Sequence, residues 1–260
     1  MPRQTYLTVA SLAAALGIAL TAPASGQEQR PANASEKTAA RSETVDIIAL
    51  RDWDYQALYD NGWSARRLMD TSVYGPEGDE IGEVENIIID ENGHALAIIA
   101  EVGGFWDIGD THVAVPWDEV GRENADRVTI PVREETVEDY SIFHVVGNVG
   151  ATKRVAEDVT AGPRKWKATE LLDDYVVLAN DENYGYVSDL IFDNDGAVRS
   201  VIVAPASGHG YVGPFAYPFY RYPHAWSPGH EYYRLPYSRE EVSRAELFDY
   251  NKMNDNGFGR

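Results

Sequence analysis

The stretch EIGEVENIIIDENGHALAIIAEV, residues 80–102, decides the fold of this 260-residue chain. Residues 80–90 set aliphatic side chains among polar neighbours, and residues 95–102 are again rich in Ile, Ala and Val, as strands are. Between them, Asp90-Glu91-Asn92-Gly93 combines residues that favour tight turns. The stretch therefore predicts two antiparallel strands, 80–90 and 95–102, joined by a turn.

The chain repeats this pattern 103 residues later, as NYGYVSDLIFDNDGAVRSVIVAP at residues 183–205. The ungapped alignment begins where Trp63 meets Trp166. Identical positions include Leu68, Asp70, Val73, Gly82, Val84, Ile88, Asp90, Gly93 and Ile99, which meet Leu171, Asp173, Val176, Gly185, Val187, Ile191, Asp193, Gly196 and Ile202. Most of these residues build cores and turns, so the repeat predicts two copies of one β-module.

Each copy contains an unbroken apolar triplet at the end of its first long strand. The triplets are Ile87-Ile88-Ile89 and Leu190-Ile191-Phe192. A strand that is exposed on one face alternates apolar and polar residues, whereas a continuous apolar run indicates burial on both faces. We expect the other copy, or the linker around residues 140–143, to cover these strand ends.

The first copy resembles the PRC-barrel domain. The resemblance rests on Gly82-x-Val84, Asp90-x-x-Gly93, Gly103-Gly104 and Val113-Ala114-Val115-Pro116-Trp117. It implies an all-β fold with two small antiparallel β-barrels in tandem, at residues 63–135 and 166–250, joined by a linker at 136–165. In barrels of this size side chains fill the interior. The family includes the H subunit of photosynthetic reaction centres and a ribosome maturation factor, in which the barrel is an interaction module.

The N-terminus indicates export. Arg3 precedes an apolar run, and small residues at 22–26 suit a signal peptidase, so residues 1–26 are expected to be a signal peptide cleaved near residues 24–26. The alternative is an uncleaved membrane anchor. A flexible polar leader at 27–45, a pre-domain segment at 46–62 and a polar tail at 251–260 complete the expected organisation. We expect a periplasmic protein without a transmembrane helix in the mature chain.

The charge and the cysteine count exclude several classes of function. The chain has 42 acidic and 22 basic side chains, a net charge of -20, which disfavours nucleic acids and anionic membranes as partners. It has no cysteine, which excludes disulfides, thiolate metal ligands and cysteine nucleophiles. We expect no cofactor.

The second copy departs from the first after residue 205. If Leu235-Pro236-Tyr237 is the counterpart of Val115-Pro116-Trp117, residues 206–233 are an aromatic insertion, and its prolines disfavour regular strands or helices. Aromatic side chains can form a recognition surface, or they can fold back as a lid over the module. The candidate binding residues are Tyr217, Phe219, Tyr220, Tyr222 and Trp226.

No catalytic motif is recognisable. His209, His224 and His230 are the metal-ligand candidates of the insertion, but their spacing fits no established site. The glycine pattern at 208–213 resembles a dinucleotide fingerprint, but Pro214 and Pro218 prevent the helix that such a site requires. The sequence therefore predicts a non-catalytic periplasmic interaction or scaffold protein with a protein partner. The alternative is an accessory subunit of a membrane electron-transfer complex, suggested by the reaction-centre H subunit.

The C-terminal part of the second copy combines two signals. Ser238 and Glu241 form a capping-box pattern that opens a helix. The repeat, in turn, predicts a short strand near residues 246–250.

Overall fold

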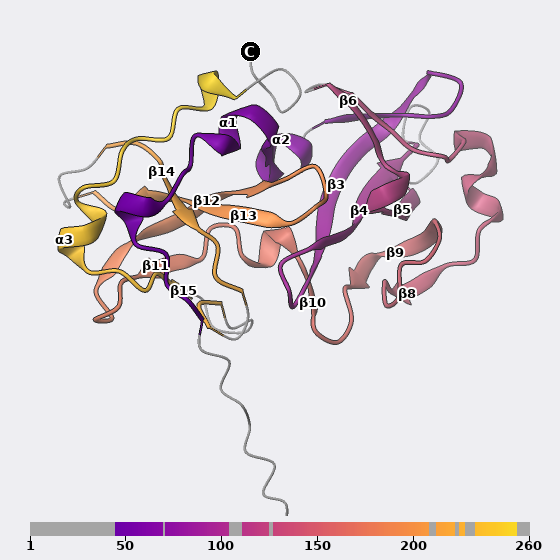
Figure 1. The fold of residues 1–260 in the computed structure, drawn as a ribbon. Helices are drawn as coiled ribbons and strands as arrows, with labels where there is room; N and C mark the ends of the chain where they lie inside the picture. The colour runs from indigo at the N-terminus through magenta and orange to yellow at the C-terminus, as the bar shows by residue number, and fades with distance from the viewer. Residues whose placement is uncertain are drawn as a thin grey trace, which may run out of the picture. The chain divides into compact units, whose positions relative to one another are not determined.

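The two hairpins predicted from the sequence form at the expected residues. A computed structural model describes residues 45–69, 71–103, 111–124, 127–207, 212–221, 224–226 and 232–253. In it, β3 (Glu80–Asp90) pairs with β4 (Ala95–Val102), and β12 (Asn183–Phe192) pairs with β13 (Val198–Pro205). Register shifts occur at equivalent places in both, after Val84 and after Val187. Figure 1 shows the two hairpins next to each other.

An aspartate and a glycine close each hairpin turn. Asp90 Oδ1 accepts hydrogen bonds from the backbone N–H groups of Asn92 and His94, both at 2.9 Å. Asp193 Oδ1 does the same for the backbone of residues 195 and 197. Gly93 and Gly196 adopt φ values of 78° and 88°, which favour glycine. These bonds give Asp90 and Asp193 a structural role in closing the turns.

Each hairpin is the centre of one sheet. In the described residues, the first sheet has the order β6-β7-β2-β3-β4-β5-β9-β8, with β10 paired to β3. The second has the order β14-β13-β12-β11-β15, with β1 paired to β12. The remaining strands of the first sheet are β2 (Ser72–Tyr74), β5 (Thr111–Pro116), β6 (Gly121–Asn124), β7 (Arg127–Thr129), β8 (Phe143–Val145), β9 (Lys153–Thr160) and β10 (Lys165–Lys167). Those of the second are β1 (Trp63–Ser64), β11 (Tyr175–Val177), β14 (Phe215–Pro218) and β15 (Tyr232–Arg234).

The described helices are all short. They are α1 (Ala57–Asn61), α2 (Ala65–Met69) and α3 (Arg239–Val242), with 3-10 turns η1 (Leu50–Asp52), η2 (Trp117–Glu119), η3 (Glu134–Asp139), η4 (Ala168–Glu170) and η5 (Tyr250–Lys252). The predicted capping box is confirmed, since Ser238 Oγ accepts from the backbone N–H of Glu241 at the start of α3. The strand expected near 246–250 is reduced to a single bridge between Phe215 and Leu247.

The expectation of two closed antiparallel barrels is not met in the described residues. The fold is mostly β, but each strand order has two ends, and β2 pairs with β7, and β11 with β15, in parallel. Part of the reason is that the β3 edge at residues 88–90 is taken by β10, a strand from the other repeat.

The two repeats exchange their first strands. Trp63 of β1 pairs with Phe192, while Trp166 of β10 pairs with Ile89. These two pairs are equivalent at the offset of 103 residues. Each repeat therefore completes the sheet of the other.

The exchange gives the repeats a common core. One buried cluster contains Val84, Ile87 and Ile98 of the first hairpin together with Leu190 and Val201 of the second. Because these side chains pack against one another, the repeats are not independent beads on a linker.

The outer faces of the strand ends are also covered, as the apolar triplets predicted, but only that of Ile88 is covered by one of the expected segments. Ile88 is fully buried with Val146 and Val155 of the linker. Ile191 is fully buried with Tyr59 of the pre-domain segment and Phe248 near the C-terminus. The linker thus forms β8 and β9 of the first sheet instead of a free connection.

The strand pairing corrects the predicted long insertion. Pro116 of β5 lies opposite Ala97, and Pro218 of β14 lies opposite Ser200, the counterpart of Ala97. Residues 113–117 therefore correspond to residues 215–219. Pro218 is compatible with a strand because it ends a strand at the sheet edge.

The motif that was used to define the insertion has a different counterpart. Leu235-Pro236 follows β15 as Ile130-Pro131 follows β7, and both strands pair in parallel with equivalent partners. Residues 206–233 thus include β14, the counterpart of β5. The prediction that these residues lack regular strands is wrong.

No helix in the described part of the chain is long and apolar enough to cross a membrane. The expected signal peptide and almost all of the leader, residues 1–44, lie outside the described residues.

Candidate functional site at the junction between the repeats

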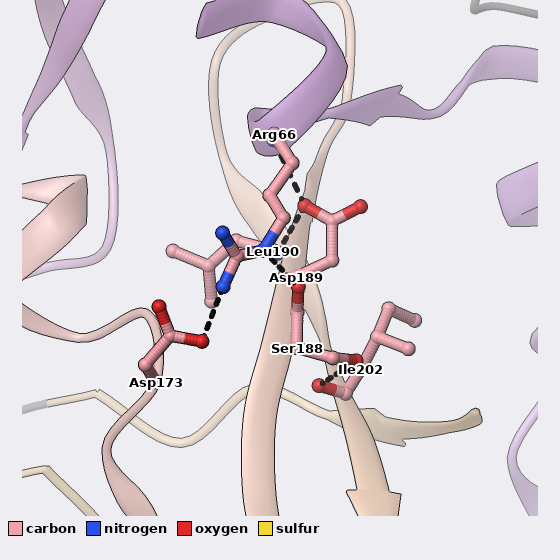
Figure 2. Close-up of polar contacts among 6 residues, drawn as sticks. All are labelled: Arg66, Asp173, Ser188, Asp189, Leu190 and Ile202. Carbon is pink, nitrogen blue, oxygen red and sulfur yellow. Dashed lines mark hydrogen bonds and ion pairs between the residues drawn. The ribbon is translucent and has the colours of Figure 1, made fainter. Parts of the chain in front are cut away.

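A buried carboxylate marks the junction between the repeats. Asp189 lies on β12 and is 2% exposed. Its oxygens accept hydrogen bonds from the hydroxyl of Ser64, the backbone N–H of Arg66 at 3.1 Å, that of Leu190 at 2.8 Å and the hydroxyl of Tyr250 at 3.1 Å. The bonds to the Arg66 and Leu190 backbone appear in Figure 2. Asp189 thus ties β1, α2 and η5 to the second sheet.

The side chain of Arg66 extends this junction to the surface. Figure 2 shows it running from α2 towards Asp173. Its guanidinium donates to the carboxylate of Asp173 at 2.5 Å and to the carbonyl of Ser188 at 2.6 Å. The Ser188 hydroxyl in turn donates to the carbonyl of Ile202 at 3.1 Å. Arg66 therefore connects the first repeat to the second through both its backbone and its side chain.

Asn86 occupies the equivalent position in the first sheet. Its Oδ1 accepts from the backbone N–H groups of Ile87 at 3.0 Å and Thr169 at 3.5 Å, as Asp189 accepts from Leu190 and Arg66. Asn86 Nδ2 also donates to the hydroxyl of Thr169 at 2.9 Å. The two halves of the junction share one geometry, but the central side chain is titratable only at position 189.

The electrostatics of Asp189 suit a structural role. Burial raises its pKa, and the hydrogen bonds from Ser64, Arg66, Leu190 and Tyr250 oppose that rise. Burial, together with the nearby Asp189 carboxylate, raises the pKa of the Tyr250 hydroxyl. Because Asp189 is buried and its oxygens are engaged by donors of this chain, it is positioned to join elements and not to exchange protons with a substrate.

The two hairpin turns also contact each other. The backbone N–H of Ala95 donates to Gly196 O, and that of Val198 donates to Gly93 O, both at 2.8 Å. Aromatic rings cover both turn glycines. A Cβ on Gly196 would lie 2.7 Å from Trp117 Nε1, and one on Gly93 would lie 2.8 Å from the ring of Phe219. Trp117 and Phe219 are themselves equivalent in the corrected alignment.

The aromatic candidate residues lie mainly in the core. Tyr217, Tyr220 and Trp226 are 0%, 5% and 1% exposed. The Tyr217 hydroxyl lies 2.6 Å from that of Tyr184, and the Trp226 ring packs edge-on against Trp166 at 4.9 Å.

The remaining aromatic candidates are Phe219 and Tyr222. Phe219 is partly buried and stacks on Tyr233 with ring centroids 5.9 Å apart. Tyr222 lies outside the described residues. Of the described candidates, Tyr217, Tyr220 and Trp226 are thus buried in the module, and Phe219 keeps a partly exposed ring.

The hydroxyl groups of Tyr220 and Tyr237 bind the backbone of the pre-domain segment. The Tyr220 hydroxyl accepts from the backbone N–H of Ile48 at 3.0 Å, and the Tyr237 hydroxyl donates to the Ile48 carbonyl at 2.8 Å. The two hydroxyls are 2.8 Å apart. Tyr237 and Asp189 were not identified from the sequence. A polar residue at the same place in two apolar strands, 86 and 189, was the signal that could have revealed the junction.

The histidine candidates do not form a metal site in the described structure. His224 is exposed, while His209 and His230 lie outside the described residues. Among the residues that are described, no group of three or more His, Asp or Glu side chains is placed to hold a metal ion.

Comparison with known families bears on the first repeat. Residues 61–137 match the family model of the PRC-barrel domain. This range contains the first hairpin and closely follows the module predicted at 63–135. A search of curated proteins finds no match.

Proposed function

We propose that this chain is a non-catalytic interaction or scaffold protein of the periplasm, built from two PRC-barrel modules that form one rigid unit. The PRC-barrel match at residues 61–137 supports a protein-interaction module. The second module is supported by the equivalence of its strand pairs to those of the first, including the exchanged strands β1 and β10.

The observation that carries this proposal is the use of buried polar groups to join segments of the chain. Asp189, Asn86 and the tyrosine hydroxyls at 220 and 237 all bond within the chain. A catalytic site needs convergent polar groups that a substrate can reach. Here the buried polar groups hold elements together, which is what a rigid platform for a partner requires.

Cross-linking in cells tests the proposal. The full-length chain with a C-terminal tag is cross-linked in its host and isolated under denaturing conditions, with an equally acidic exported protein as control. We expect a defined protein partner that the control does not capture. Failure to recover any partner specific to this chain would overturn the scaffold function.

The proposed periplasmic location has a separate test. The mass of the isolated protein is expected to correspond to cleavage near residues 24–26, and the protein is expected in the periplasmic fraction. A retained N-terminus in the membrane fraction would support the uncleaved anchor instead.

A further inference from the structure

The inference concerns β8, the strand at one end of the first sheet. Figure 1 shows β8 beside β9, and the strand order ends with it. Its residues, Phe143, His144 and Val145, are all exposed. Phe143 is 47% exposed, Val145 is 46% exposed and the preceding Ile142 is 52% exposed. An exposed sheet edge with apolar side chains is a template for pairing with another chain.

The other sheet ends in the described residues lack this combination. At β6, the Arg122 side chain is only partly exposed and donates to the carbonyls of Trp117 and Asn194, and a charged residue protects an edge against pairing. β14 is covered by the bridge between Phe215 and Leu247, and β15 by that between Trp226 and Tyr233. β8 therefore differs from these ends in being both apolar and uncovered by any described segment.

The strand is held in an extended conformation by its inner neighbours. The backbone N–H of Val146 donates to the carbonyl of Thr160 at 2.8 Å, and Val146 is fully buried. The ammonium of Lys153 donates to the Val146 and Asn148 carbonyls, at 2.5 and 2.7 Å. A preformed edge loses little entropy on binding, because the backbone is already ordered.

The charges around β8 indicate what kind of chain would fit. Glu157 and Asp158 on β9, the strand that pairs with β8, are exposed. Asp158 lies 3.9 Å from the His144 ring.

Two cations in this region, Lys153 and Arg133, are engaged. The Lys153 ammonium is bonded to carbonyls, and Arg133 pairs with Glu77 at 3.1 Å. The charged side chains of β9 that are exposed, Glu157 and Asp158, are both negative. Their charge opposes pairing with a second copy of this chain, which has a net charge of -20, and favours a basic partner.

We propose that β8 is a docking edge to which an extended, basic segment of a partner protein adds as a further strand. Alternate apolar side chains of that segment contact Phe143 and Val145, which share one face of the strand, and its Lys or Arg side chains face the carboxylates of Glu157 and Asp158 on β9. This inference rests on the proposed scaffold function and identifies the surface and the partner chemistry.

A designed peptide provides the test. The full chain is titrated into a labelled octapeptide of alternating Lys and Val, and binding is followed by fluorescence anisotropy. Two control peptides replace every Lys by Glu, or every second Val by Pro, which cannot form a continuous ladder. We expect binding of the Lys-Val peptide and at least about tenfold weaker binding of both controls.

A pair of matched variants locates the binding. The double variant Phe143→Lys, Val145→Lys adds two positive charges at the edge. Ile47→Lys, Ile48→Lys adds the same charge at residues that are 50% and 40% exposed on the pre-domain segment. Only the first is expected to weaken peptide binding, by at least about tenfold. Equal loss in both variants, or equal binding of the Glu-Val or Pro peptide, would overturn the docking edge, as would self-association through β8.

The same edge variant separates this inference from the proposed function. If cross-linking recovers the same partner with the wild-type chain and with Phe143→Lys, Val145→Lys, the scaffold function stands and the docking edge is wrong. If neither chain recovers a partner, the scaffold function fails.

Discussion

His94 and Ala197 face each other in an antiparallel β-bridge, and each is the equivalent of the other in the sequence repeat, 103 residues apart. The flanking bonds, Ala95 N–H to Gly196 O and Val198 N–H to Gly93 O, have the same length of 2.8 Å. A pair of equivalent residues in contact is what a twofold axis produces in a symmetric dimer. The repeats are thus related as two subunits of a dimer would be, within one chain.

The buried carboxylate is expected to be important for stability. Asp189→Ala would leave the Ser64 and Tyr250 hydroxyls and two backbone N–H groups without their acceptor, so the free energy of unfolding should fall by about 3 kcal/mol. Urea denaturation measures this.

The control for Asp189 is Asp173→Asn, which keeps a residue that tolerates the φ of 69° at this position. The Asp173 side chain is 77% exposed in its pair with Arg66, so the expected loss is below about 1 kcal/mol. Equal losses at positions 189 and 173 would contradict the role of Asp189 as a junction.

The same residue should give the stability a pH dependence. Burial raises the pKa of Asp189 in the folded state, so the folded protein binds this proton more tightly than the unfolded chain does. The stabilisation from Asp189 is then fully present below its unfolded pKa and is lost as the pH rises through the folded pKa.

Asp189→Asn does not titrate and serves as the reference. The free energy of unfolding of the wild type minus that of Asp189→Asn should therefore fall as the pH rises from below the unfolded pKa towards neutrality. Urea titrations across this range measure the difference. A difference that grows with pH would show that the hydrogen bonds to the carboxylate outweigh its burial.

The turn glycines should be sensitive to a single methyl group. Gly196→Ala places a Cβ against the Trp117 ring, in addition to the strain of a φ of 88°. Gly78→Ala is the matched control, because φ is 89° there and the added Cβ makes an ordinary contact of 3.6 Å with Arg127. We expect a loss of about 1 kcal/mol for Gly78→Ala and about 2 kcal/mol or more for Gly196→Ala. Similar melting temperatures for both variants would refute the packing of Trp117 on the opposite turn.

The aromatic segment should act as part of the core. Trp226→Ala removes a ring that is 1% exposed and packs on Trp166, which should cost about 3–5 kcal/mol in unfolding free energy. The nearby exposed His224→Ala should change it by less than about 0.5 kcal/mol. If Trp226→Ala kept full stability but lost a cross-linked partner, this segment would be a recognition surface.

The hairpins were predictable from the sequence because their signals are local. Strand composition and the pair of residues Asp90 and Gly93 are enough to place both strands and the turn, and the repeat confirms the same reading for Asp193 and Gly196. The apolar triplets also predicted burial on both faces, since that inference needs no knowledge of which segment provides the cover.

The exchanged strands and the junction were not predictable in the same way. β1 and β10 are two and three residues long and carry no pattern that specifies a partner strand. β14 was missed because its prolines disfavoured a strand and because Leu235-Pro236-Tyr237 was taken as the counterpart of Val115-Pro116-Trp117, so its equivalence to β5 became visible only through its pairing with β13. Such long-range contacts depend on the packing of the whole fold.

The most direct test of the account is calorimetry of the full-length chain, since its central claim is that exchanged strands and a common core join the repeats into one unit. We predict a single thermal transition whose calorimetric enthalpy equals its van't Hoff enthalpy. Two resolved transitions, each assignable to one repeat, would contradict the claim.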